Sequence, residues 1–93
     1  MGSRLTAVQI GEHLSALTAW RAVDRRTAIR RSFEFPTFRA AVAFVAYVAE
    51  LAEAADHHPD IEIRYNRVTL TLSTHSAGGL TDKDFTLAAR IHT

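Results

Sequence analysis

Cysteine is absent from the 93-residue sequence, and its absence removes two classes of site. Without thiols the chain can form neither disulfides nor thiolate-bound metal centres. Nothing therefore argues for an oxidising compartment, and we expect the protein to work in the cytoplasm. The first residues of the sequence also lack the apolar core of a signal peptide.

The sequence also lacks a long hydrophobic run and an excess of charge. Its longest apolar run, residues 40–49, is alanine-rich and far shorter than the ~20 apolar residues of a membrane-spanning helix. The net charge of +1 is close to neutral, so the basic footprint of a nucleic-acid-binding domain is not indicated. We therefore expect neither a membrane nor a nucleic acid as a direct partner.

The composition is that of one small globular domain, covering residues 1–93. Apolar residues make up 47% of the chain and charged residues 23%, which excludes a disordered or fibrous protein. A domain of this size buries only somewhat more than ~60% of the surface that its unfolded chain exposes. Its stability margin is therefore small, and we expect a partner subunit to contribute to it.

Capping signals mark the first and the last predicted helix. Thr6 and Gln9 have the spacing of a capping box, and apolar residues at helical spacing continue from there to about Thr18. Thr81 and Asp84 form a variant of the same box and open a last helix. Asp84 therefore has a structural role available to it as the cap partner of Thr81.

The strongest periodicity lies in residues 38–55, which follow the cap residue Thr37 and predict a long helix. Its apolar side chains form two adjacent stripes, which together cover about half of the helix circumference: Phe38, Val42, Val45, Ala49 and Ala52, and Ala41, Phe44, Val48, Leu51 and Ala55. Packing against one sheet buries only one of these stripes. The second stripe therefore predicts that another surface, such as a second subunit, covers the remaining apolar side chains of the helix.

Four segments have the character of strands: residues 20–23, 28–35, 61–65 and 67–73. The polar residues 24–26 between the first two predict a hairpin with a loose loop. Asn66 separates the last two and tolerates the left-handed conformation of a tight hairpin. Arg31 breaks the alternation of its strand, and the sequence does not explain it. The resulting order, α-β-β-α-β-β-α, predicts an α+β domain in which helices cover one face of a four-stranded antiparallel sheet.

The candidate chemistry is concentrated where the long helix should end. Pro59 restricts the residue before it to extended geometry, so we expect the helix to stop at or before His58 and to leave two imidazoles on a fixed corner. His75 follows the last strand, and four carboxylates lie near the three histidines in the sequence: Glu53, Asp56, Asp60 and Asp84. Imidazoles both donate and accept protons near neutral pH, so this set is typical of acid–base chemistry.

Simpler interpretations of the same residues remain open. Adjacent histidines at a helix end also fit a polar terminus that favours the helix dipole, and an isolated His75 fits a surface position. A zinc site is not expected, because no His-x-x-x-His spacing is present and adjacent histidines tend to diverge. Nucleophilic catalysis is not indicated either, since Ser73 and Ser76 lack an elbow motif.

Taken in order, these residues resemble the pterin-4a-carbinolamine dehydratase family, whose animal members are also dimerisation cofactors of a homeodomain transcription factor. The family pattern runs Glu-x-x-x-His-His-Pro, aromatic-Asn, Thr-His, Gly-Leu and Asp. The matching residues here are Glu53, His57, His58, Pro59, Tyr65, Asn66, Thr74, His75, Gly79, Leu80 and Asp84. The match spans most of the chain, and it is the combination of motifs that is specific.

The resemblance implies a 4a-hydroxytetrahydrobiopterin dehydratase, a carbon–oxygen lyase that forms quinonoid dihydropterin in tetrahydrobiopterin recycling. It implies His57, His58 and His75 as catalytic residues and Asp84 as an accessory one. Pro59, Ser73, Thr74 and Ser76 would line the pterin site. No metal or cofactor is implied, because the pterin is the substrate. Implied partners are a second copy of the chain, as a homodimer or homotetramer, and an aromatic amino acid hydroxylase.

From the chemistry we expect His57 and His75 to be the acid–base pair, with His58 orienting the pterin. One departure from the animal members is Ile61, which stands where they carry an aromatic residue, so ring stacking is lost there. Two alternatives remain: a non-catalytic pterin-binding, assembly or transcriptional coactivator module, and a dehydratase-like protein of molybdopterin metabolism. The fold cannot distinguish them.

Overall fold

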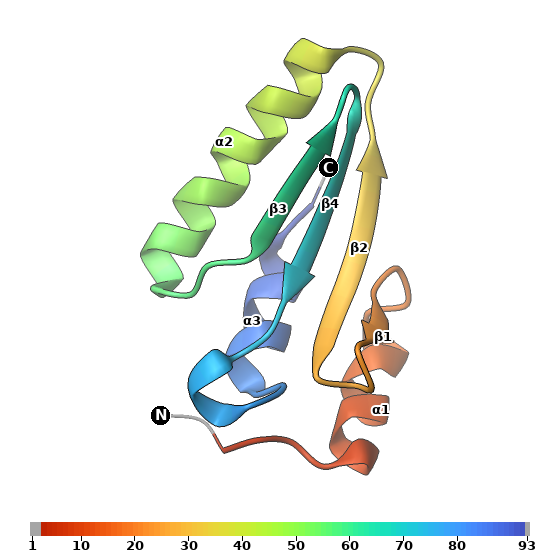
Figure 1. The fold of residues 1–93 in the computed structure, drawn as a ribbon, viewed down its shortest axis with the longest axis vertical. Helices are drawn as coiled ribbons and strands as arrows, with labels where there is room; N and C mark the ends of the chain where they lie inside the picture. The colour runs from red at the N-terminus through yellow and green to blue at the C-terminus, as the bar shows by residue number, and fades with distance from the viewer. Residues whose placement is uncertain (1–2, 93) are drawn as a thin grey trace.

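The computed structural model describes residues 3–92 and shows a four-stranded antiparallel sheet with helices on one face (Figure 1). The elements in chain order are α1 (Ala7–Ala16), β1 (Arg21–Val23), β2 (Ala28–Glu34), α2 (Phe38–Ala55), β3 (Asp60–Arg64), β4 (Arg67–Leu72), the short 3₁₀ helix η1 (His75–Ala77) and α3 (Asp82–Arg90). The predicted α+β class and the order α-β-β-α-β-β-α are confirmed. No helix among the described residues is long and apolar enough to cross a membrane.

The strands are arranged in the order β1-β2-β4-β3, with every pair antiparallel. β4 lies at the centre between β2 and β3, and β3 is an edge strand whose residues are all exposed. Alternate residues of β4 (Val68, Leu70 and Leu72) are fully buried on the face covered by helices. The opposite face, here called the open face, carries the polar residues of the same strands.

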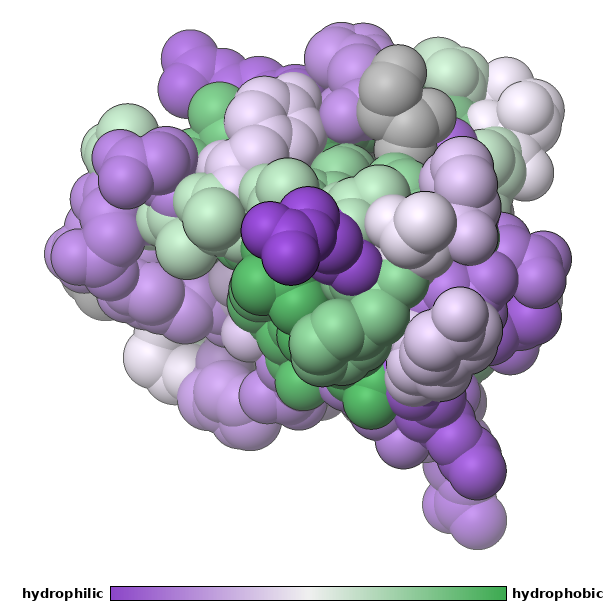
Figure 2. Space-filling model, turned by 90° about the horizontal axis from the view of Figure 1, so that it is seen from above, coloured by the Kyte–Doolittle hydropathy of each residue, from purple (hydrophilic) through white to green (hydrophobic). Residues whose placement is uncertain are grey.

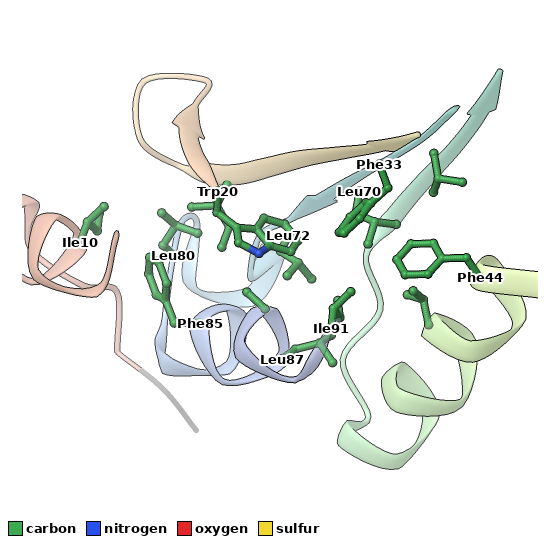
Figure 3. Packing of buried hydrophobic residues seen from close by; sticks show 14 of the residues in the cluster. Ile10, Trp20, Phe33, Phe44, Leu70, Leu72, Leu80, Phe85, Leu87 and Ile91 are labelled. Carbon is green, nitrogen blue, oxygen red and sulfur yellow. The ribbon is translucent and has the colours of Figure 1, made fainter. Parts of the chain in front are cut away.

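The core lies between the sheet and the helices (Figure 3). In that view Leu70, Leu72 and Phe33 extend from the strands towards Phe44 of α2 and Leu87 of α3. Phe33 and Phe44 meet as tilted rings with centroids 4.6 Å apart. The interior is therefore filled by interdigitated side chains from both layers, as close packing requires.

Local signals account for most element boundaries. Both predicted capping boxes are present, at Thr6 with Gln9 and at Thr81 with Asp84. α1 ends at Ala16, two residues earlier than the periodicity indicated. Arg31, which the sequence left unexplained, places its guanidinium 4.2 Å from the centroid of the Phe33 ring, so a cation–π contact accommodates its charge among apolar neighbours.

The β3–β4 turn differs from the expectation. The left-handed residue is Tyr65, with φ 55°, whereas Asn66 was expected to adopt that conformation. Asn66 instead binds the end of β2: its Nδ2 donates to the Phe35 carbonyl at 2.7 Å, and its own carbonyl accepts from the Phe35 N–H at 2.9 Å. These two bonds fix Asn66 in the tertiary structure, so the preceding residue takes the strained position.

α2 extends over the predicted residues, and its two stripes differ in burial. Ala41, Phe44 and Val48 of one stripe are buried against the sheet, whereas Phe38 and Val42 of the other stay 52% and 42% exposed. Figure 2, seen from above, shows apolar side chains gathered at the end of the molecule where Figure 1 places the start of α2. The predicted surplus of apolar surface on this helix is therefore present.

Candidate active site

The corner that carries the two histidines forms as the sequence indicated. α2 stops at Ala55, and its cap residue Asp56 is left-handed, with φ 50°. The His57 N–H still reaches back to the Ala52 carbonyl, at 3.1 Å, and Pro59 then prevents further helix. His57 and His58 therefore occupy a fixed connection between α2 and β3.

A buried carboxylate, Asp84, organises the interior side of this corner. Its exposed fraction is 0%, and its Oδ1 lies 2.6 Å from His57 Nε2. Its Oδ2 accepts hydrogen bonds from Thr74 Oγ1 at 2.8 Å and from the Thr81 N–H at 3.0 Å. Asp84 is thus both the cap partner of Thr81 and the partner of His57, and three bonds offset the cost of removing its charge from water.

The hydroxyl groups around Asp84 can be oriented by counting hydrogens. Thr74 has one hydroxyl hydrogen, which it donates to Asp84, so its oxygen must accept in the 2.8 Å contact with Thr81 Oγ1. Thr81 Oγ1 in turn accepts from the Lys83 N–H at 3.3 Å. The result is a chain of donors that ends on Asp84 and ties the Thr74 segment and the start of α3 to His57.

The solvent side of the corner opens on a cleft of about 330 Å³. Its lining includes His58, Ser73 and His75 together with Asp60 and Thr71. This volume lies at the lower end of the ~300–1,000 Å³ range of small-ligand pockets. These five residues therefore present two imidazoles, two hydroxyls and a carboxylate to one space large enough for a small polar molecule.

In residues 57–58 and 73–75, successive side chains alternate between the cleft and the buried hydrogen-bond network around Asp84. Ser73 and His75 line the cleft, whereas Thr74 between them is buried against Asp84. Likewise His58 lines the cleft, whereas its neighbour His57 binds Asp84. A single buried carboxylate thereby holds the two backbone segments that carry the cleft histidines.

The structure separates His57 from the other two histidines at the cleft. The side chain of His57 is 11% exposed and lines a second cavity, of about 320 Å³, beside Lys83 and Leu87 of α3. His58 contacts Glu53 at 2.6 Å on the surface, where such a pair contributes only about 0–1 kcal/mol. His57 and His75, expected to face one ring, thus do not line the same cavity in this arrangement.

The expected pterin-lining residues are distributed unevenly. Ser73 lines the cleft and donates its hydroxyl to the Thr27 carbonyl at 2.7 Å. Thr74 belongs to the buried network, while Pro59 and Ser76 are outside the lining of the cleft. His75 begins η1, because β4 ends at Leu72 before the strand alternation reaches it.

The sequence reasoning missed the part of the cleft that the β1–β2 hairpin supplies. Asp24, Thr27 and Ala28 line it, because β2 pairs with β4 and brings the hairpin beside Ser73. The strand pairing that places them was not predicted. Gly78 also lines the cleft; its φ of 71° is the left-handed region that favours glycine and allows the chain to turn after His75.

Comparison with known proteins identifies the family. The sequence model described as pterin 4 alpha carbinolamine dehydratase matches residues 3–93. A protein of Chloroflexus aggregans, provisionally named pterin-4-alpha-carbinolamine dehydratase, is 55% identical over 89 residues, which are 96% of this chain and 94% of that protein. This chain belongs to the pterin-4a-carbinolamine dehydratase family. A relative of Acidobacterium capsulatum with the same provisional name is 57% identical over 89 residues, covering 96% and 95% of the two chains.

Two solved structures extend the comparison. A Brucella melitensis protein described as a transcriptional coactivator/pterin dehydratase superposes with a TM-score of 0.90 at 46% identity, covering 96% of this chain and 95% of that one. A pterin dehydratase-like protein, described as a RuBisCO assembly factor in the alpha-carboxysome, gives a TM-score of 0.67 at 26% identity over 78% and 84% of the chains. Proteins of this fold are thus described both as dehydratases and as assembly or coactivator proteins.

Ile61 is the position at which the sequence departs from the expected pattern. The side chain is 38% exposed on the edge strand β3 and, because Ile61 pairs with the buried Leu70, it projects to the side of the sheet that the helices cover. Among residues 3–92, no group of three or more histidine, cysteine, aspartate or glutamate side chains is placed to hold a metal ion.

Proposed function

We propose that this chain is a dehydratase that eliminates water from 4a-hydroxytetrahydropterins, such as 4a-hydroxytetrahydrobiopterin, in the recycling of tetrahydrobiopterin. The observation that carries the proposal is the convergence of His58 and His75 on one cleft, directly against the buried Asp84–His57 pair. Family membership supports the same chemistry. The cytoplasm remains the expected compartment.

The reaction needs two proton movements at neighbouring atoms of the pterin. A base takes the proton from N5, an acid protonates the hydroxyl on C4a, and the C4a–O bond breaks as the C4a–N5 double bond forms. The products are quinonoid dihydropterin and water, and no electron leaves the substrate. The step therefore balances without an oxidant, a reductant or a further cofactor, and two imidazoles suffice for it.

We assign proton transfer to His75, which lines the cleft, and to His57, with His58 and Ser73 holding the ring. Because His57 lines the neighbouring cavity, this assignment requires the bound ring to reach from the cleft to the His57 imidazole. Asp84 supports the assignment of His57. Because the Asp84 carboxylate can only accept a hydrogen bond, the proton of the neutral His57 ring lies on Nε2, and Nδ1 can accept a proton from the substrate. His58 lines the cleft directly, so it is the alternative to His57 as the proton-transfer partner of His75. Steady-state kinetics of the His57→Ala and His58→Ala variants distinguish the two assignments.

The function is tested by letting an aromatic amino acid hydroxylase generate the carbinolamine and adding this protein in catalytic amounts. We expect the absorbance change of the quinonoid product to accelerate in proportion to the added protein. The control is the same amount of heat-denatured protein, which corrects for spontaneous dehydration. An unchanged rate would remove the enzymatic proposal.

A second candidate function is a protein-binding module, and one observation favours it. Phe38 and Val42 leave an apolar strip of α2 exposed, and structural relatives are described as a coactivator and as an assembly factor. The same assay separates the two functions: a module would bind a protein partner tightly without accelerating dehydration. A dehydratase-like role in molybdopterin metabolism would instead appear as a preference for an anionic pterin.

A further inference from the structure

A small cavity away from the cleft brings together two hydrogen-bond donors, Trp20 and Arg31. It has a volume of about 190 Å³ and shares no lining residue with the cleft that holds His58 and His75. Its other walls come from the end of α1 and from the last turns of α3. This space, here called the Trp20 cavity, takes no part in the proposed pterin chemistry.

The first donor is the indole N–H of Trp20, which is buried and unpaired. The residue is 4% exposed, and its Nε1 has no hydrogen-bond partner among residues 3–92. Figure 3 shows this nitrogen on the edge of the ring that is turned towards α3, the helix whose Ala88 and Ala89 line the cavity. An indole can only donate, and a buried donor without an acceptor is destabilising. The Trp20 cavity is therefore a place for an acceptor.

The second donor, Arg31, occupies an unusual position in the sheet. It pairs with Leu70 and lies between the buried Ile29 and Phe33 at alternate positions of β2, so it projects to the face that the helices cover. No carboxylate within the described part of the chain forms an ion pair with it. Its contact with the Phe33 ring uses the face of the guanidinium and none of its N–H donors.

Strand register brings the two donors side by side. Arg21 pairs with Arg30, so continuing the same antiparallel register by one residue places Trp20 opposite Arg31. Opposite residues of antiparallel strands project to the same face of the sheet. One neutral donor and one charged donor therefore face a common space.

The rest of the lining indicates which acceptor fits. It is mostly small and apolar: Ala16, Leu17, Ala19, Ala88, Ala89 and Ile91. None of the described lining residues is acidic, and His92 is the other residue there that can carry a positive charge. The volume exceeds what one water molecule requires and lies below the ~300–1,000 Å³ of pockets for drug-sized ligands. A small anion with an apolar part matches these walls.

We propose that the Trp20 cavity binds a small aliphatic monocarboxylate, such as propionate. The planar fork of the Arg31 guanidinium matches the two carboxylate oxygens, one of which also accepts from the Trp20 N–H. The alkyl group then lies against the alanines. A bound carboxylate would neutralise the charge on the covered face and connect β2 to α3, the helix that carries Asp84.

The binding can be observed at the donor itself. Trp20 is the only tryptophan of the sequence, so its indole N–H gives a single cross-peak in a nitrogen–proton NMR spectrum. Sodium propionate is titrated into the isotope-labelled full chain at constant ionic strength, with sodium chloride as the reference. We expect a saturable downfield shift of the indole proton and a dissociation constant of about 1–10 mM, as for other ligands of so few atoms. Sodium phosphate should bind more weakly, because its additional charged oxygens would meet apolar walls.

Two adjacent arginines of β2 provide matched variants. Arg31→Gln should weaken propionate binding by about tenfold or more, because charge-assisted hydrogen bonds are lost. Arg31→Lys keeps the charge on the covered face but loses the planar fork, so it should weaken binding less. Arg30→Gln makes the same change of charge on the opposite face, where Arg30 Nε donates to Thr71 Oγ1, and should bind propionate as the unmodified protein does.

Each contrary result overturns the proposal in a recognisable way. An indole proton that does not move with propionate, or that moves equally with chloride, would leave water as the acceptor of Trp20. Tighter binding of phosphate than of propionate would contradict the carboxylate assignment. Unchanged affinity in both Arg31 variants would place the anion elsewhere on the chain. None of these readouts depends on dehydration activity, so they are separate from the test of the proposed function.

Discussion

At the scale of single residues, the site depends on one carboxylate with two duties. Asp84 caps α3 through the Thr81 N–H and binds His57 through its other oxygen. A motif that ends in Asp looks like ordinary capping in the sequence, and that interpretation is correct but incomplete. The resemblance implied an accessory role for Asp84 as well, and the fold shows the contact that such a role requires, 2.6 Å from Asp84 Oδ1 to His57 Nε2.

The three histidines are predicted to differ in which kinetic constant they control. His57→Ala should lower kcat by about 10²–10⁴-fold, because it removes a positioned proton-transfer group. His58→Ala should chiefly raise KM, since it removes a contact with the ring in both the ground state and the transition state. Steady-state kinetics on the coupled assay measure both constants, and His13→Ala on α1 is the control. A large loss of kcat in His58→Ala alone would transfer the proton-transfer role to that residue.

The buried network should also contribute to stability. Thr74→Val keeps the shape of the side chain but removes the donor to Asp84 and the acceptor for Thr81. Leaving a buried charged acceptor with one bond fewer costs about 1–3 kcal/mol. Thermal unfolding should show a lower Tm than for Thr86→Val, an exposed position on α3. Equal Tm values for the two variants would show that the Thr74 bond contributes nothing.

At the scale of elements, local chemistry predicted the helices well and the turns less well. α2 runs from Phe38 to Ala55 as its periodicity indicated, because capping at Thr37 and the corner before Pro59 are both local. The β3–β4 turn was misassigned, because the left-handed residue is chosen by the long-range bonds of Asn66 to Phe35. The β1–β2 hairpin was predicted, but its place beside the cleft was not, since that depends on the pairing of β2 with β4, which no local pattern reveals.

The edge strand β3 and the strip on α2 form one apolar surface. Ile61 and Ile63 are 38% and 37% exposed, and they alternate with the open-face residues Asp60 and Glu62, so they face the same side as α2. Phe38 and Val42 extend that surface. An unpaired strand edge beside exposed apolar groups is a template for a second chain.

We therefore expect the protein to form a homodimer or homotetramer at micromolar concentration, with this surface at an interface. Size-exclusion chromatography with light scattering measures the mass directly. Ile63→Lys should reduce it, because a buried lysine would lack a partner, whereas Val8→Lys introduces the same charge at an exposed valine of α1 and should not. A monomer in the unmodified protein would contradict the expectation.

At the scale of the whole molecule, the fold brings together two segments that are distant in the sequence. The α2–β3 corner supplies His58, the chain after β4 supplies Ser73 and His75, and Asp84 holds both from the interior. The histidines and the acid were predicted from the sequence. Their division between a cleft and a buried network was not, because it depends on which side of each segment faces α3.

The most direct measurement of the central claim is the rate of quinonoid dihydropterin formation from hydroxylase-generated carbinolamine, with the unmodified protein and His75→Ala compared at equal catalytic concentration. We predict clear acceleration by the unmodified protein and a rate about 10²–10⁴-fold lower for the variant, which retains the Asp84 network and His58 but lacks the His75 imidazole. Equal rates for the two proteins, or no acceleration by either, would contradict acid–base dehydration at this cleft.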